Sequence, residues 1–137
     1  MLTIHTADEG GAVAVEGSRI AGTGTLPELQ QRFPGARVRS WPGVLGPARV
    51  HEGPLPAAPS PRERIHAVLK TGATAVLAEH VDSLELRVAA ERNGVEILTR
   101  PRPMTLVDLG RADLAVFDGA GTCIATVCAG RLVHRRR

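Results

Sequence analysis

Apolar and polar residues alternate near both ends of the chain. In residues 13–20 two valines alternate with other residues before a turn at residues 16–17, and an isoleucine resumes the pattern after it. Residues 124–133 repeat this pattern around residues 129–130. A period of two interrupted by a glycine-containing turn predicts a β-hairpin with one buried face. Because an isolated hairpin is marginally stable, we expect the two hairpins to pair or pack into one small sheet or sandwich. A short helix is expected over residues 27–33.

The middle of the chain follows a helical period interrupted by short apolar runs. Ser60, with a proline next and Glu63 three positions on, is a capping box that opens a helix ending near residue 71. A strand is predicted over residues 74–78, a second helix over residues 82–94 and a further strand over residues 95–98. Helices that alternate with short apolar strands are typical of parallel β/α units.

Two proline-rich segments bracket this middle part. The resulting prediction is an α+β fold. Residues 1–41 and 104–137 together form a small β-sandwich or curled sheet, and residues 42–103 form a short inserted β/α segment. The two chain ends therefore meet in one composite β-domain.

Length and composition favour a single globular domain. The 137 residues are 43% hydrophobic and 23% charged, and no apolar run approaches the length of a membrane span. The first residues lack the pattern of a secretory signal, so we expect a cytoplasmic protein with reduced cysteines. Cys123 and Cys128 are expected to be buried and unpaired, on opposite faces of one strand.

The net charge of +3 is concentrated at one end. Without Arg135, Arg136 and Arg137 the basic residues number 17 − 3 = 14, which equals the 14 acidic ones, so we interpret the excess as a solvated tail. A nucleic-acid accessory role would rest on this tail alone, and three aromatic residues in all argue against it. Sixteen arginines to a single lysine indicate a GC-rich bacterial genome.

Four stretches resemble the amidohydrolase superfamily, in particular imidazolonepropionase and aminodeoxyfutalosine deaminase-like proteins. "AVAVEGSRIAGTG" is similar to the opening hairpin of their composite domain, and "PGVLGPARVH" to the approach to their first barrel strand. "ERIHAVLKTGATAV" resembles their first barrel helix and second strand, and "GRADLAVFD…VCAGRLVHR" their closing strands. The resemblance implies a composite β-domain, a (β/α)₈ barrel and a metal-dependent C–N hydrolase.

The sequence departs from this family at the barrel. A closed barrel takes about 250 residues, whereas residues 42–103 number only 62. If "ARVH" aligns with the family's pair of metal-binding histidines, Arg49 replaces the first, and His51 is the surviving member. A permanent cation repels a metal ion. The family's later ligands belong to strands that have no counterpart here, and Lys70, the one lysine, falls in a predicted helix.

A metal site rebuilt at the strand ends is the alternative. Side chains beyond the carboxyl ends of parallel strands project from one sheet edge. The candidate metal ligands there are His51, Glu52, Glu79 and His80, and the candidate ligand-binding cations are Arg49 and Arg100. Imidazole and carboxylate groups suit zinc or another divalent metal. In the competing interpretation these are solvated loop residues.

Two functions follow from these observations. The first is an amidohydrolase-like binding or assembly module that has lost C–N hydrolase activity and needs no cofactor. The second is a small metal-dependent hydrolase acting on non-peptide C–N bonds, with its site completed across a dimer. A truncated barrel exposes strand edges, so a symmetric homodimer is expected in either case, and an enzyme partner is an alternative.

Overall fold

The computed structural model describes residues 1–136 and has the predicted α+β architecture. Its larger sheet has seven strands in the order β10-β9-β8-β4-β1-β2-β3. The strands and the helix between them are β1 (Leu2–Glu9), β2 (Ala12–Glu16), β3 (Arg19–Gly24), α1 (Leu26–Arg32), β4 (Arg37–Pro47), β8 (Leu114–Phe117), β9 (Cys123–Cys128) and β10 (Arg131–Arg135). Both predicted hairpins form, as β2–β3 and β9–β10, and they occupy opposite ends of the sheet order.

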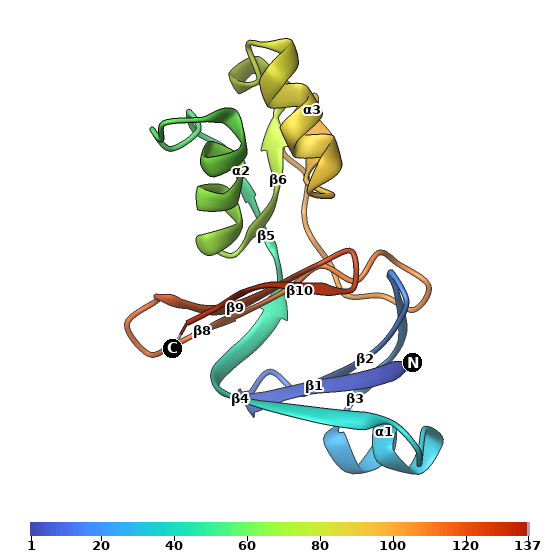
Figure 1. Ribbon diagram of the computed structural model, residues 1–137. Coiled ribbons are helices and arrows are strands. Elements are labelled where there is room, and N and C mark those ends of the chain that lie inside the picture. Colours follow the sequence, from blue (N-terminus) through green and yellow to red (C-terminus); the bar gives the residue numbers. More distant parts are fainter. Residues whose placement is uncertain (137) are drawn as a thin grey trace.

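The sheet folds over along β4, and this bend makes the predicted β-sandwich. The first half of β4 pairs with β1, whereas Val44 to Pro47 pair with β8. Gly43 directly precedes Val44, which pairs with both β1 and β8, and it has φ of +98°, a conformation that favours glycine. The strands β8, β9 and β10 consequently lie over β1, β2 and β4 as a second layer (Figure 1). Between the layers, Ile20, Trp41 and Ile124 belong to one buried cluster.

The inserted segment forms a three-stranded parallel sheet with two helices. Its elements are β5 (Arg49–His51), α2 (Pro61–Lys70), β6 (Ala73–Leu77), the short 3₁₀ helix η1 (Ala78–His80), α3 (Leu84–Arg92) and β7 (Glu96–Leu98). The strand order is β5-β6-β7, and both pairings are parallel, as predicted. The Oγ atoms of Ser60 and Ser83 accept hydrogen bonds from the backbone N–H groups of Glu63 and Leu86, so the predicted helix starts are confirmed.

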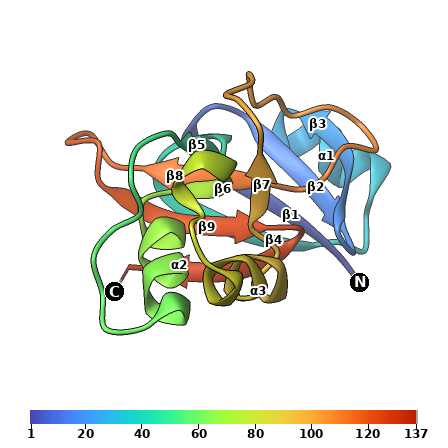
Figure 2. The ribbon, with the colours of Figure 1, turned by 90° about the horizontal axis from the view of Figure 1, so that it is seen from above.

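The helices of the insertion pack on the outer face of the sandwich. Val68 of α2 and Leu86 of α3 share a buried cluster with Cys128 of β9, and Val133 of β10 packs against it. Thr126 is fully buried in β9, and its hydroxyl donates to the Leu69 carbonyl at 2.7 Å. Figure 2 shows α2 and α3 lying across the strands of the sandwich. The insertion is therefore fixed to the β-domain by both apolar and polar contacts.

The opposite outer face is covered by α1. Leu29 of this helix is buried with Ile4 and Ala14. Thr25 and Glu28 form a complete capping box at its start. The molecule thus stacks α1, two β-layers and the β/α insertion in that order (Figure 1). The strand β4 is continuous from residue 37 to residue 47, so it passes through residues 41 and 42, where the sequence analysis placed the start of the insertion. The N-terminal part of the large sheet therefore extends to residue 47.

Two sequence-based expectations about side chains are wrong. A β-bulge at Ile124 puts both cysteines on the face that carries Thr126: the Cys123 sulfur lies 3.3 Å from the Thr126 hydroxyl. Cys128, two residues beyond Thr126, contacts the insertion. Both cysteines are free and buried, as expected. Arg135 ends β10, and Arg136 forms a 2.9 Å ion pair with Asp118, so these two residues are anchored rather than frayed. None of the helices in residues 1–136 has the length and apolarity needed to cross a bilayer.

Candidate functional site

The carboxyl ends of β5, β6 and β7 lie at one edge of the small sheet. The candidate side chains that follow these strands differ in exposure: His51 and His80 are half-buried, whereas Glu52, Glu79 and Arg100 are exposed. The His51 Nε2 atom lies 2.9 Å from the Pro54 carbonyl, within hydrogen-bond distance. His80 ends η1, a single 3₁₀ turn that extends the chain beyond β6. The topology therefore brings the predicted residues to a common edge.

These residues do not assemble a metal centre. Across residues 1–136, no three His, Cys, Asp or Glu side chains are placed so that they could hold a metal ion. When the His51 Nε2 atom donates to the Pro54 carbonyl, it has no lone pair for a metal. The divalent metal that the resemblance implies does not fit this donor set, and no catalytic step can be derived through it.

Arg49 takes part in a different arrangement. Its guanidinium carbon lies 3.9 Å from the centroid of the Phe117 ring, a cation–π contact between β5 and the end of β8. The pair borders a hollow of about 540 Å³ that is also lined by Glu52, Arg102 and Met104. Arg100 does not line it. The arginine that replaces a family histidine thus faces a hollow with two cations and one carboxylate.

A polar network joins β7, an edge strand of the small sheet, to the sandwich. Arg111 donates from Nε to the Asp113 carboxylate at 3.0 Å, and Arg102 bonds to Glu96 at 2.9 Å. Arg111 also donates to the Gly94 carbonyl and, at 3.1 Å, to the sulfur of Cys128. Burial raises the pKa of the Asp113 carboxyl, while Arg111 and a backbone N–H oppose that shift. These contacts hold the inserted segment against the β-domain.

Neither Arg111 nor Asp113 is among the site residues that the sequence analysis predicted. Arg111 and Asp113 are two positions apart just before a strand, and in an extended chain this spacing places both side chains on the same side. This was the one sequence feature that indicated a contact between them. Two other partners of Arg111, Gly94 and Cys128, lie 17 residues before and after it in the chain, so the pattern alone could not reveal the network.

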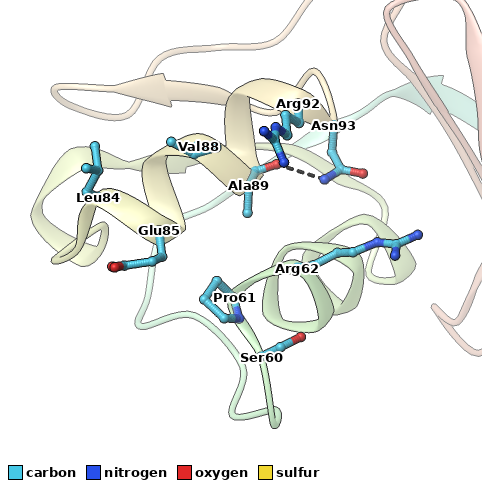
Figure 3. Close-up of a pocket in the computed structure, with 9 residues that line it drawn as sticks. All are labelled: Ser60, Pro61, Arg62, Leu84, Glu85, Val88, Ala89, Arg92 and Asn93. Carbon is cyan, nitrogen blue, oxygen red and sulfur yellow. Dashed lines mark hydrogen bonds between the residues drawn. The ribbon is translucent and has the colours of Figure 1, made fainter.

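A groove of about 700 Å³ lies between α2 and α3 (Figure 3). Ala89 points from α3 toward α2, and Pro61, Val88 and Leu84 add apolar surface, with Leu84 71% exposed. Its polar lining residues are Ser60, Arg62, Glu85, Arg92 and Asn93. The groove offers a surface for contact, and it carries no nucleophile–base pair. The groove forms because α2 packs beside α3. The hydrophobic periodicity within each helix does not predict how two helices pack, so the sequence analysis did not find the groove.

The comparisons with known proteins bear on the composite domain. Residues 11–36, which include β2, β3 and α1, match the family model of the bacterial imidazolonepropionase-like composite domain. The match confirms the resemblance to amidohydrolase-type composite domains that the sequence motifs indicated. No curated protein gives a significant match.

One similar solved structure is a guanine deaminase from Bradyrhizobium japonicum, with 15% sequence identity and a TM-score of 0.48. The similarity covers 64% of this chain and 27% of the deaminase chain. The chain therefore corresponds to about a quarter of the length of that enzyme.

Proposed function

We propose that this protein is a binding or assembly module with an amidohydrolase-like composite domain and without C–N hydrolase activity of its own. The observation that carries the proposal is the state of the two positions that resemble the family's first metal-binding pair. Arg49 stacks on Phe117, and His51 lies against the Pro54 carbonyl. Arg49 is a permanent cation, and His51 keeps only its Nδ1 atom as a donor, with no group of three ligands around it in the described residues.

The shortness of the insertion supports the same proposal. β4 and β8 belong to the composite sheet, and only three parallel strands lie between them. A closed barrel has eight, and its catalytic groups come from the ends of several of them. The missing strands are internal, so the argument does not depend on where the chain begins or ends.

Metal content and turnover test the loss of activity. Protein purified without chelators or a histidine tag is analysed by elemental mass spectrometry and assayed against amidine, imidazolone and aminopurine compounds. We expect metal far below stoichiometric and no turnover. The variants His51→Ala and His80→Ala are compared with His66→Ala, which removes an exposed histidine of α2. Stoichiometric metal that only the first two variants lose would contradict the proposal and favour the small metal-dependent hydrolase.

The hollow beside Arg49 is the proposed ligand site of the module. Arg102 is already ion-paired with Glu96, whereas Arg49 forms no ion pair within the described residues and shares the hollow with one carboxylate, Glu52. With the apolar surface of Phe117 and Met104, the cation of Arg49 suits a small anion with an apolar body. Isothermal titration with benzoate, compared with benzamide, measures this preference. Arg49→Gln should weaken benzoate binding, and Arg62→Gln on α2 should not. Equal binding of benzoate by all three proteins would contradict the assignment.

Assembly is proposed to occur between two copies. β5 and β7 are the edge strands of the small parallel sheet, and open edges are commonly paired or covered. Sedimentation equilibrium should show a dimer. Leu84→Gln, which makes the α2–α3 groove more polar, should leave the dimer intact if the strand edges form the contact. A monomer at all concentrations would contradict this part of the proposal.

A further inference from the structure

The two layers of the sandwich separate at one end and leave a recess of about 140 Å³. Thr3 and His5 of β1 and Arg39 of β4 line it from one layer, and Gly130 and Leu132 line it from the last hairpin. No aspartate or glutamate is among its lining residues. The polar groups that face this recess are therefore neutral or positively charged.

The protonation of His5 follows from its neighbour. His5 is 5% exposed, and the Trp41 indole N–H lies 3.3 Å from its Nδ1 atom. An indole nitrogen can only donate, so Nδ1 must carry the lone pair. Burial, with the charge of Arg39 as a smaller cause, lowers the pKa of His5 to about 4. At neutral pH the proton of the ring is therefore on Nε2, which has no protein hydrogen-bond partner within residues 1–136.

Two arginines lie beside the same tryptophan. The guanidinium carbons of Arg39 and Arg135 are 5.7 and 5.8 Å from the centroid of the Trp41 ring. Within the described part of the chain, neither arginine forms an ion pair, whereas Arg102, Arg111 and Arg136 do. Of the two, Arg39 lines the recess and Arg135 does not, so Arg39 is the cation that an anion in the recess would neutralise.

We infer that this recess is a binding site for a carboxylate group. Arg39 is the ionic partner, because a guanidinium fork matches the two oxygens of a carboxylate. The Nε2–H of His5 and the hydroxyl of Thr3 are the additional donors. The volume of the recess suits a carboxylate on a short stem. This site lies in the composite β-domain, and the inference does not depend on the proposed loss of hydrolase activity.

The carboxylate has two possible sources, a small free acid or an acidic side chain of a bound protein segment. β10 ends the sheet order, so its outer edge has no strand partner in the sheet, and Leu132 of this strand lines the recess. An extended segment that added to this edge could place a glutamate or aspartate in the recess. Both sources use the same donors.

Trp41 is the only tryptophan of the chain, and it reports on the site through its hydrogen bond to His5 and its contact with Arg39. Sodium acetate is titrated at constant ionic strength, and the indole N–H resonance and the fluorescence of Trp41 are followed; acetamide is the uncharged control. We expect a saturable change with acetate and none with acetamide. Arg39→Gln should weaken binding at least about tenfold, since it removes the ionic partner. Arg87→Gln, which removes an exposed charge on α3, should bind as the native protein does.

A blocked Glu-Val-Glu-Val peptide and its glutamine counterpart distinguish the two sources. If the acidic peptide binds more tightly than acetate and also shifts the amide resonances of β10, the carboxylate comes from a protein segment. If it does not, the ligand is a small free acid. Thr3→Val provides a second, milder variant should Arg39→Gln not fold.

Three results would overturn the inference. The first is a change in the Trp41 signal that never saturates and that chloride reproduces. The second is unaltered acetate binding by folded Arg39→Gln or Thr3→Val. The third is displacement of acetate by a short oligonucleotide that binds more tightly than acetate and the acidic peptide.

Discussion

The guanidinium of Arg111 and the carboxylate of Asp113, 3.0 Å apart, connect three parts of the molecule. Asp113 also accepts the backbone N–H of Ala129 in the turn of the last hairpin, at 2.9 Å. Arg111 reaches in the other direction to the carbonyl of Gly94, between α3 and β7. The pair thus holds the closing hairpin and the insertion in fixed positions relative to each other.

Removing the carboxylate of this pair should destabilise the protein strongly. Asp113 is buried, and Asp113→Ala leaves the Arg111 charge and the Ala129 N–H without their partner. The expected cost is about 2 kcal/mol, because the half-buried Arg111 keeps only Glu96, at 3.9 Å, and the Gly94 carbonyl as partners, while the Ala129 N–H loses its acceptor. Urea unfolding followed by circular dichroism measures the loss. Asp108→Ala removes an exposed carboxylate nearby in sequence and should change the free energy of unfolding by less than about 0.5 kcal/mol. Equal effects of the two substitutions would show that the pair carries no special stability.

The bend of β4 predicts a sharp difference between two glycines of the same strand. Gly43 has φ of +98°, and a Cβ atom there would lie 2.2 Å from the Phe117 carbonyl oxygen. Gly46 does not have a positive φ, and a Cβ atom added to it would meet no other part of the described chain within 4 Å. Gly43→Ala should therefore lower the free energy of unfolding by about 2 kcal/mol or more, and Gly46→Ala by much less. Thermal and urea unfolding of both variants check this, and comparable stability of the two would argue against the bend as a strained corner.

The sequence predicted the local elements well because their causes are local. Ser60 and Ser83 cap their helices through side-chain contacts within three residues. The turn of the first hairpin requires only its own residues: Gly17 has φ of +60°, and a Cβ atom there would meet nothing in the described chain within 4 Å. The parallel order of β5, β6 and β7 follows from the helices that connect them.

The features that the sequence did not predict depend on distant neighbours. The bulge at Ile124 reverses the side on which Cys123 lies, and it arises in the pairing of β9 with β8. Arg135 was interpreted as part of a solvated tail, yet it extends β10 and lies near Trp41, almost a hundred residues earlier in the chain. The sequence was sufficient to place the candidate ligands at one edge of the small sheet. It could not predict the contact of His51 with Pro54, because that contact depends on the path of the loop after β5.

Both thiols should be protected in the folded protein. Burial raises the pKa of Cys123 and of Cys128, so little of either is in the reactive thiolate form near neutral pH. We expect the reaction with Ellman's reagent at pH 8 to be at least about a hundredfold slower in buffer than in urea, where two thiols per chain react. Rapid reaction of one thiol in buffer would identify a cysteine that is accessible in solution.

The state of His5 makes stability depend on pH in a defined direction. Its pKa is lowered from 6.5 to about 4 in the folded protein, chiefly by burial and additionally by Arg39. Between these values the unfolded chain binds a proton that the folded chain does not, so stability falls as the pH falls from about 6.5 toward 4. The expected loss is about 2 kcal/mol between pH 7 and pH 5 and about 3 kcal/mol once the pH is below 4.

Urea unfolding of the native protein and of His5→Gln at several pH values isolates this contribution. The variant should be less stable at pH 7, because it replaces the buried imidazole ring that contacts Trp41 with a side chain of different shape. Its stability should also vary less with pH. His80→Gln removes a histidine outside the sandwich and should retain the native pH dependence. Because Trp41 donates to His5, protonation of Nδ1 must break that hydrogen bond, so the indole N–H resonance of the folded protein should shift with a midpoint near pH 4, the pKa of His5 in the folded state. An indole resonance that shifts with a midpoint near pH 6.5, or a pH dependence that His5→Gln leaves unchanged, would contradict the assignment to His5.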